Sequence, residues 1–253
     1  MRLSAGRGRW FPAVLVLLAL GGAVWGVGRI PLTTQVGVNY DVAERRVTLS
    51  EKAAHFLSRH LAMRRLAREI TEAKETPVEK ALAMHTWVVK NILPGENVRS
   101  LPVTDDHPLS IVTRGYGTGE QRADLFSVLC GYAGIPAALY LLRHPESGEA
   151  IVLAVVQLAG VFHLFDPARD NLFFLEGGRM AGLADLRKNP ELAAKARNQP
   201  KIRGIPYADY FSGIHPVPPF PRYLRADLQR PFPRILYQAG RLLGWVKPPP
   251  LFF

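Results

Sequence analysis

One stretch of the sequence, residues 117–142, restricts the possible folds more than any other. It reads GTGEQRADLFSVLCGYAGIPAALYLL, which is a glycine turn, an apolar helix over about residues 120–133, the tripeptide Gly-Ile-Pro and an apolar strand. Short apolar segments bounded by turn residues then predict strands at 151–158 and 161–165, and a fourth at 171–174. A helix followed by short strands with tight turns predicts an α+β fold, in which helices pack on a small antiparallel sheet.

Two helices are predicted before this stretch. Thr48 with Glu51 has the pattern of a capping box, and the helix that follows is expected to reach about residue 73. Its expected apolar side consists of Phe56, Leu57, Leu61, Leu66 and Ile70, and its other side carries arginines. Thr76-Pro77 with Glu79 begins a second helix with apolar residues at helical spacing. These are Val78, Ala81, Leu82, Trp87, Val88 and Ile92.

The N-terminus has the pattern of an exported protein. Three arginines precede an uncharged apolar run from residue 10 to residue 27, which Arg29 closes. The run is longer than the ~7–15 residues of a signal-peptide core and close to the ~20 residues of a spanning helix. We therefore expect residues 10–28 to be an uncleaved anchor, with a cleaved signal as the alternative. The excess of arginines before the run predicts a single pass through the inner (cytoplasmic) membrane, with the bulk of the chain in the periplasm or outside.

The rest of the chain is basic, with a net charge of +11 and a pI of about 10.1. Such a surface favours acidic partners: lipid headgroups, an acidic glycan or an acidic face of an envelope protein. The sequence has no nucleic-acid-binding signature, so nucleic acid is not an expected partner. One cysteine excludes an intrachain disulfide. No metal or cofactor is expected either, since the Asp-Asp-His triplet at 105–107 fits a solvated loop better than an ion site.

The C-terminal part, residues 177–253, is a basic Pro-rich extension, and the prolines from residue 199 onward predict a wrap or tail rather than a second core. The segment RILYQAGRLLGWVK predicts an amphipathic helix. The helix either docks on the domain or lies in a membrane interface. Its apolar residues are Ile235, Leu236, Ala239, Leu242, Leu243 and Val246.

Residues 76–174 resemble the transglutaminase-like superfamily. The resemblance rests on MHTWVVKNI, on the glycine turn before the helix, on Gly-Ile-Pro after it and on Asp166-Pro167 at the end of the third strand. It implies a papain-like fold with a Cys-His-Asp triad. Counting back from Gly-Ile-Pro places Gly119 at the cysteine position. The family's usual hairpin length places Ala150 at the histidine position, while Asp166 matches the aspartate.

Two of the three triad positions therefore carry residues that cannot perform thiol chemistry, which needs a thiolate beside an imidazole. Without a histidine to orient, Asp166 is better interpreted as an aspartate that caps a turn before proline. Thr118, His144 and His163 are the residues that could refill the missing roles, and Ser127 and Cys130 are weaker candidates. The expected remnant is an empty binding groove at the N-terminus of the helix, formed by Gly117, Thr118, Gly119 and Glu120 with Trp87.

The sequence thus predicts an N-terminal anchor or signal segment (1–30), a linker with a basic helix (31–75), a transglutaminase-like core (76–176) and a basic Pro-rich extension (177–253). The expected function is non-catalytic binding or assembly at the cell envelope. The alternative is an active, thiol-independent hydrolase or acyltransferase that uses the same cleft.

Overall fold

The computed structural model describes residues 22, 25–33, 46–95, 106–195, 201–247 and 252. The chain divides into two compact units, residues 1–58 and 59–253, and each unit is described by itself. The expected anchor lies mostly outside the described residues. Among the helices that the structure does describe, none has the length and apolar character needed to cross a bilayer.

The first unit contains a small hairpin and the beginning of a long helix. Strand β1 (Pro31–Thr33) pairs antiparallel with β2 (Arg46–Thr48), and helix α2 (Leu49–Thr71) follows directly. The predicted capping box is present: the Thr48 backbone N–H donates to the Glu51 carboxylate (2.7 Å), and the Glu51 N–H donates to the Thr48 hydroxyl (3.2 Å). These two bonds fix the start of α2.

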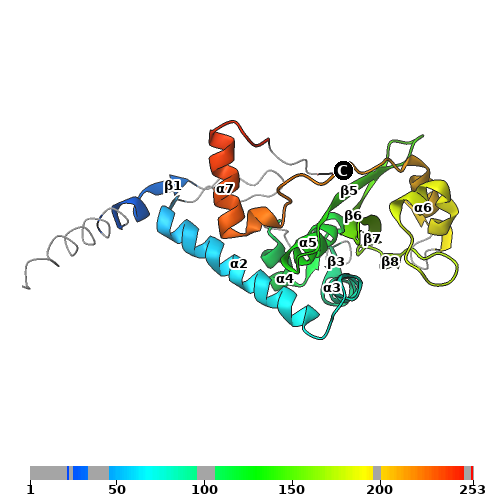
Figure 1. Cartoon of the computed structure of the whole chain (residues 1–253), viewed down its shortest axis with the longest axis horizontal. Coiled ribbons are helices and arrows are strands. Elements are labelled where there is room, and N and C mark those ends of the chain that lie inside the picture. Colours follow the sequence, from blue (N-terminus) through cyan, green and yellow to red (C-terminus); the bar gives the residue numbers. More distant parts are fainter. Residues whose placement is uncertain are drawn as a thin grey trace, which may run out of the picture. The chain divides into compact units, whose positions relative to one another are not determined.

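The second unit is built around one helix and one sheet (Figure 1). Helix α5 (Gly119–Tyr132) packs against strands β5 (Ala137–Arg143) and β6 (Ala150–Leu158), and on its other side against α3 (Pro77–Asn91) and α4 (Pro108–Arg114). Strands β7 (Val161–Asp166) and β8 (Asn171–Leu172) complete an antiparallel sheet in the order β5-β6-β7-β8. The helix, the four strands and the α+β class agree with the sequence prediction.

A short parallel pair brings the end of α3 to the start of α5. Strand β3 (Leu93–Pro94) pairs with β4 (Tyr116–Gly117), so that Pro94 lies opposite Gly117. Along the chain, helix α4 lies between these two strands. It was not predicted from the sequence, because it is short. The predicted capping box of α3 is confirmed, with Thr76 and Glu79 bonded to each other's backbone. This connection places α3 beside the first turn of α5.

The apolar faces of α2 and α3 differ in part from the prediction. The residues of α2 that enter the core are Met63 and Ala67, with Leu66 and Ile70 partly buried, whereas Leu57 and Leu61 are exposed. On α3, Val78 is exposed, and the buried set includes Met84 and His85. The arginine-rich side of α2 is exposed, as a solvated face should be. The apolar pattern predicted where each helix lies in the sequence, but it did not predict which side of the helix faces the core.

The C-terminal extension forms a second core, which contradicts the prediction of a wrap without one. One apolar cluster lies between the sheet and helices α2–α5. A second covers the opposite face of the sheet, where Leu153, Val155 and Leu164 meet residues from the extension. Those residues come from α6 (Leu183–Lys188), η2 (Pro190–Lys195) and η3 (Tyr207–Gly213). A strand buried on both faces needs a second apolar layer, and here the extension supplies it.

The end of the extension holds α5 in place. Arg225 pairs with the buried Asp124 of α5 (2.5 Å), and the Arg230 guanidinium donates to the carbonyl of Gly131. The Tyr132 hydroxyl donates to the carbonyl of Gln229 (3.1 Å). Helix α7 (Pro231–Leu242) follows this segment after η4 (Asp227–Gln229). Residues 225–230 are therefore part of the packing of the domain.

Two leucines of the extension test its role in the second core. Leu186 is fully buried, so Leu186→Ala should lower the free energy of unfolding by about 2–5 kcal/mol. Leu242 is 89% exposed, and Leu242→Ala should change it by no more than about 0.5 kcal/mol. Urea unfolding of the full chain in detergent measures both. Equal effects would show that the extension does not form a core.

Candidate functional site

The first turn of α5 is fixed by a polar network. Thr118 is the N-cap, and it forms a capping box with Gln121. Gln121 is buried, donates to the Asp106 carboxylate (2.7 Å) and accepts from Arg114 (2.6 Å). Gly119 is the first residue of α5, where the resemblance places the nucleophile. These hydrogen bonds hold the turn in place. The hydroxyl of Thr118 itself accepts a hydrogen bond from the helix backbone.

The space beside Gly119 is filled by Ala168, from the turn between β7 and β8. A Cβ atom on Gly119 would lie 3.1 Å from the Cβ of Ala168, which is closer than ordinary contact. Arg122, buried one turn further along α5, donates to the carbonyl of Ala168 (2.7 Å) and holds the turn in this position. The expectation that glycine leaves an empty space here is therefore wrong, since a neighbouring side chain occupies it.

Asp166 is fully buried and engaged in structural contacts. Its carboxylate accepts from the Tyr207 hydroxyl (2.8 Å) and the Arg169 guanidinium (3.0 Å), and also from the Arg169 backbone N–H (3.2 Å). The last bond closes the turn that begins at Asp166-Pro167, as a turn-capping aspartate does. Burial, followed by the charge of Asp166, raises the pKa of Tyr207 well above its ordinary value. Tyr207 therefore stays protonated and donates.

The histidine position does not meet Asp166. Ala150 is exposed at the start of β6, whereas Phe165, next to Asp166, pairs with Ala154. Asp166, one residue further along β7, therefore lies at the level of Leu153, which is three residues of strand, or about 10 Å, from Ala150. The β6–β7 connection is a tight turn with positive φ at Ala159 and Gly160, which is shorter than the hairpin that the alignment assumed. The residues of β6 near Asp166 are apolar, so β6 supplies no imidazole there, and the imidazole that does lie near Asp166 is that of His85 from α3.

The two histidines considered as replacements have other roles. His163 lies on β7, where its Nδ1 is 3.0 Å from the carbonyl oxygen of Ala181, and burial lowers its pKa. The Nδ1 of His144 is 3.0 Å from the Ser147 hydroxyl, in the loop between β5 and β6. His144 also borders a surface pocket of about 350 Å³ with Asp209 and Ser212. His163 thus contacts the segment before α6, and His144 contacts its own loop.

The remaining nucleophile candidates on α5 are buried. The Ser127 hydroxyl donates to the carbonyl of Asp124, one turn earlier (2.9 Å). Cys130 lies in the core, and burial raises the pKa of its thiol, which therefore remains protonated. Of the expected groove residues, Thr118 and Glu120 are exposed, Gly117 is buried, and Trp87 packs against the first core cluster.

His85 is a polar residue in the core that the sequence analysis missed. It lies on α3, contacts the rings of Phe126 and Phe165, and has its Nδ1 3.8 Å from the carboxylate of Asp170. Burial lowers its pKa more than this carboxylate raises it. Its Nε2 has no hydrogen-bond partner among the described residues. A histidine at helical spacing between Ala81 and Val88 could have signalled this position.

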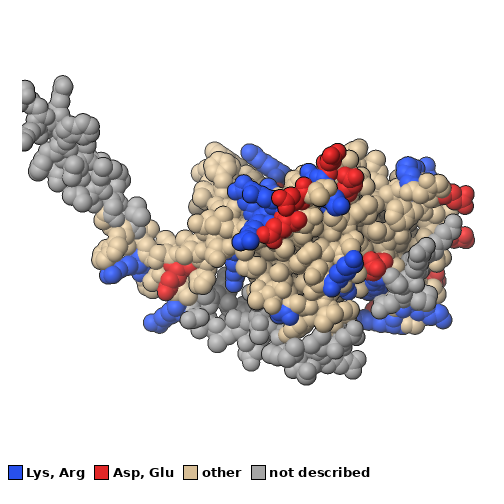
Figure 2. All heavy atoms as spheres, turned by 90° about the horizontal axis from the view of Figure 1, so that it is seen from below, with Lys and Arg blue, Asp and Glu red and all other residues tan. Residues whose placement is uncertain are grey.

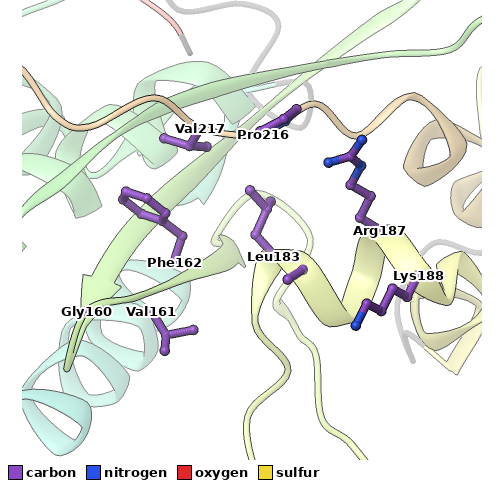
Figure 3. Close-up of a pocket in the computed structure, with 9 residues that line it drawn as sticks. Gly160, Val161, Phe162, Leu183, Arg187, Lys188, Pro216 and Val217 are labelled. Atoms are coloured by element: carbon purple, nitrogen blue, oxygen red, sulfur yellow. The ribbon is translucent and has the colours of Figure 1, made fainter.

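The structure also contains an apolar pocket of about 570 Å³ at the other end of β7 (Figure 3). Phe162, Leu183 and Val217 form its walls, and Arg187 and Lys188 of α6 stand at one side. Such a pocket can accept an apolar group whose acidic end meets the two cations. The pocket was not predicted from the sequence, because its walls come from β7, α6 and residues 216–217.

The two described residues of the Asp-Asp-His triplet, Asp106 and His107, form contacts within the fold. His107 caps α4, accepts from the N–H of Leu109 (3.1 Å), and has its Nε2 3.1 Å from the Gln229 side chain. Asp106 binds Gln121, and Asp105 lies outside the described residues. Within the described part of the chain, no group of three His, Cys, Asp or Glu residues could hold a metal ion.

Asp124 makes stability depend on pH. Burial raises its pKa to about 6, although Arg225 acts in the opposite direction. In the unfolded chain the Asp124 carboxyl has an ordinary pKa of about 4, so between pH 4 and pH 6 the folded chain binds a proton that the unfolded chain does not.

The contribution of Asp124 to the free energy of unfolding should fall by about 3 kcal/mol as the pH rises through this window, and Asp124→Asn should remove the fall. Urea unfolding at several pH values tests this, with the exposed Glu146→Gln as control; parallel profiles for Asp124→Asn and wild type would contradict it.

A cysteine placed at the nucleophile position should not restore a reaction. Gly119→Cys should lower the free energy of unfolding by about 1–2 kcal/mol, because its Cβ crowds Ala168, and Ala168→Gly should recover most of the loss. Neither variant should hydrolyse amide substrates, because the position that the resemblance assigns to the histidine carries Ala150, which cannot act as a base. Glu120→Cys, at an exposed position of the same turn, is the matched control. Turnover by the Gly119→Cys variant would contradict the account of this site.

Comparison with known proteins identifies the same region. Residues 64–161 match the family model described as the transglutaminase-like superfamily, which extends from the second half of α2 to the start of β7. The match overlaps the predicted core of residues 76–176 and begins earlier. No curated protein matches the chain.

Solved structures with a similar arrangement include two proposed proteases and a TGase. The protease from Parabacteroides distasonis is 17% identical, with 54% of this chain and 31% of that chain covered and a TM-score of 0.34. The cysteine protease from Cytophaga hutchinsonii is 19% identical, with 50% and 44% covered and a TM-score of 0.38. The TGase is 11% identical, with 66% and 48% covered and a TM-score of 0.36. This chain spans less than half the length of each.

Proposed function

Because residues 64–161 form a transglutaminase-like domain, we propose that this chain acts by binding or assembly at the cell envelope and catalyses no thiol-dependent reaction. The observation that carries the proposal is the first turn of α5. Gly119 stands where the resemblance expects a cysteine, and Ala168 closes the space beside it. The single cysteine of the chain is buried in the core with a raised pKa.

Asp166 supports the same proposal. A triad aspartate orients an imidazole, and it needs a carboxylate oxygen free to do so. In this structure both oxygens of Asp166 accept hydrogen bonds from Arg169, and one also accepts from Tyr207. The carboxylate is thus committed to the turn after β7 and to the second core.

The proposed location is the cytoplasmic membrane, with residues 10–28 as the anchor and the domain outside the cytoplasm. The net charge of +11 favours an acidic glycan, lipid headgroups or an acidic envelope protein as partner. On the face shown in Figure 2, Lys and Arg form several separate groups with Asp and Glu among them. A nucleic-acid-binding protein would more typically gather them into one patch or stripe. The pocket between Phe162 and Arg187 offers a partner an apolar wall beside two cations.

Assays on the purified full chain test the absence of catalysis. We expect no amide hydrolysis, ester hydrolysis or transamidation, and a thiol probe should label Cys130 only after unfolding, because the side chain is inaccessible. Cys130→Ala is the control for labelling. Turnover that is lost in Cys130→Ser would show a thiol enzyme, and turnover that survives Cys130→Ser but is lost in Thr118→Val would show the thiol-independent alternative.

Membrane fractionation of the full chain tests the anchor. Wild-type protein should stay in the membrane after a wash at high salt and high pH, which removes proteins bound only at the surface. Leu17→Arg with Leu18→Arg places two charges in the middle of residues 10–28 and should prevent insertion. Full retention of this variant after the wash would overturn the proposed anchoring.

A further inference from the structure

The C-terminal helix α7 exposes the face on which its large apolar residues lie. Tyr237 and Gly240 face the domain and are buried, and the ring of Tyr237 packs on that of Tyr223. At 100° per residue, the apolar residues fall in an arc of roughly 120° that points away from this contact. They are 41–89% exposed: Phe232 70%, Ile235 65%, Leu236 41%, Leu242 89% and Leu243 58%.

The end of the helix extends this surface with a tryptophan. After Leu243, Gly244 has a positive φ, and the backbone N–H of Trp245 donates to the carbonyl of Gly240 (2.8 Å). Val246 then packs on Gly240, while Trp245 remains 80% exposed. We refer to Phe232, Ile235, Leu236, Leu242, Leu243 and Trp245 as the α7 apolar face. The cap and the Tyr237 contact fix its shape before anything binds, so little ordering is needed on binding.

The charges around this face have one sign. From Arg230 to Lys247 the sequence contains four basic residues and no acidic one. Arg234 and Arg241 lie on the side of α7 away from the apolar arc, and Arg241 stacks on the Tyr237 ring. A helix with Phe, Leu and Trp on one side and arginines on the other is typical of segments that lie in the interface of an anionic bilayer.

We propose that α7 binds the surface of an anionic lipid bilayer, with its apolar face in the headgroup region and Arg234, Arg241 and Lys247 near the lipid phosphates. This contact is separate from the anchor proposed at residues 10–28. It would hold the domain against the membrane and so limit which partners the domain meets. Anionic lipids fit better than a protein partner because every charged residue from Arg230 to Lys247 is basic.

A fluorophore on α7 tests the contact in the full chain reconstituted in vesicles. Leu242→Cys labelled with an environment-sensitive dye should show a blue shift and quenching by brominated lipid in vesicles with about 30% phosphatidylglycerol. The same dye at Gln238→Cys, an exposed position on the polar side of the helix, should remain accessible to iodide. Phosphatidylcholine vesicles should give a weaker response, and high salt should reduce the response in anionic vesicles.

Charged substitutions on the exposed face give a second measurement. Ile235→Glu with Leu242→Glu alters only exposed positions and should lower the fraction of dye-labelled helix in lipid by at least about tenfold, with the dye then carried at Leu243→Cys. Gln238→Glu adds a charge on the polar side and should have a small effect. A dye at Leu242 as accessible to iodide as one at Gln238, in both kinds of vesicle, would overturn the proposal. Protection from iodide without quenching by brominated lipid, rising with protein density, would overturn it in favour of contact between copies of the chain.

The two membrane proposals fail in different measurements. Loss of the anchor appears as release of the wild-type chain by the high-salt, high-pH wash. Loss of the α7 contact appears in the dye signal of chains that remain in the vesicles. A chain that is released by the wash but still shows the blue shift in anionic vesicles would support α7 and contradict the anchor.

Discussion

The structure depends on the burial of α5, whose residues 121–130 are all inaccessible to solvent. Four of these ten residues are polar, and a buried polar group without a partner costs about 1–3 kcal/mol. The partners come from distant parts of the chain. Gln121 binds Asp106, Arg122 binds the carbonyl of Ala168, and Asp124 pairs with Arg225, while Ser127 bonds within the helix. The hydrogen bonds and the ion pair of the buried polar side chains of α5 therefore position the loop before α4, the β7–β8 turn and the C-terminal extension.

The same contacts decide what the domain can do chemically. The turn after Asp166 is drawn onto the start of α5 by Arg122, and this places Ala168 where a nucleophile would stand. Asp166 ends in the second core, bonded to Tyr207 of the extension. A catalytic site keeps such groups accessible and paired with reactive partners. Here the corresponding groups connect layers of the fold.

The sequence predicted the parts of the structure that local pattern controls. The capping residues of α2 and α3, the helix 119–132 and the four strands follow from short-range signals, and all of them are present. Contacts between distant segments were not predictable in this way. The filling of the Gly119 space by Ala168 depends on the β7–β8 turn and on the bond that Arg122 donates to it. The second core depends on residues such as Leu186 and Tyr207 that are scattered among prolines. The exposure of α7 depends on Tyr237 and Gly240, which lie off the apolar face and make the contact with the domain.

Building a triad at the positions that the resemblance assigns would need more than a cysteine at residue 119. A side chain at residue 119 requires Ala168 to move, and the bond from Arg122 opposes that movement. An imidazole would have to enter β6 near Leu153 or Ala154, and both are fully buried among apolar residues. Asp166 would then have to release Tyr207 and Arg169, which would leave the hydroxyl of Tyr207 without this acceptor in the second core. Each change alone costs stability without producing a reaction, because a thiolate, a base and an orienting carboxylate act only together. The packing of these residues therefore opposes each of the changes that such a triad would need.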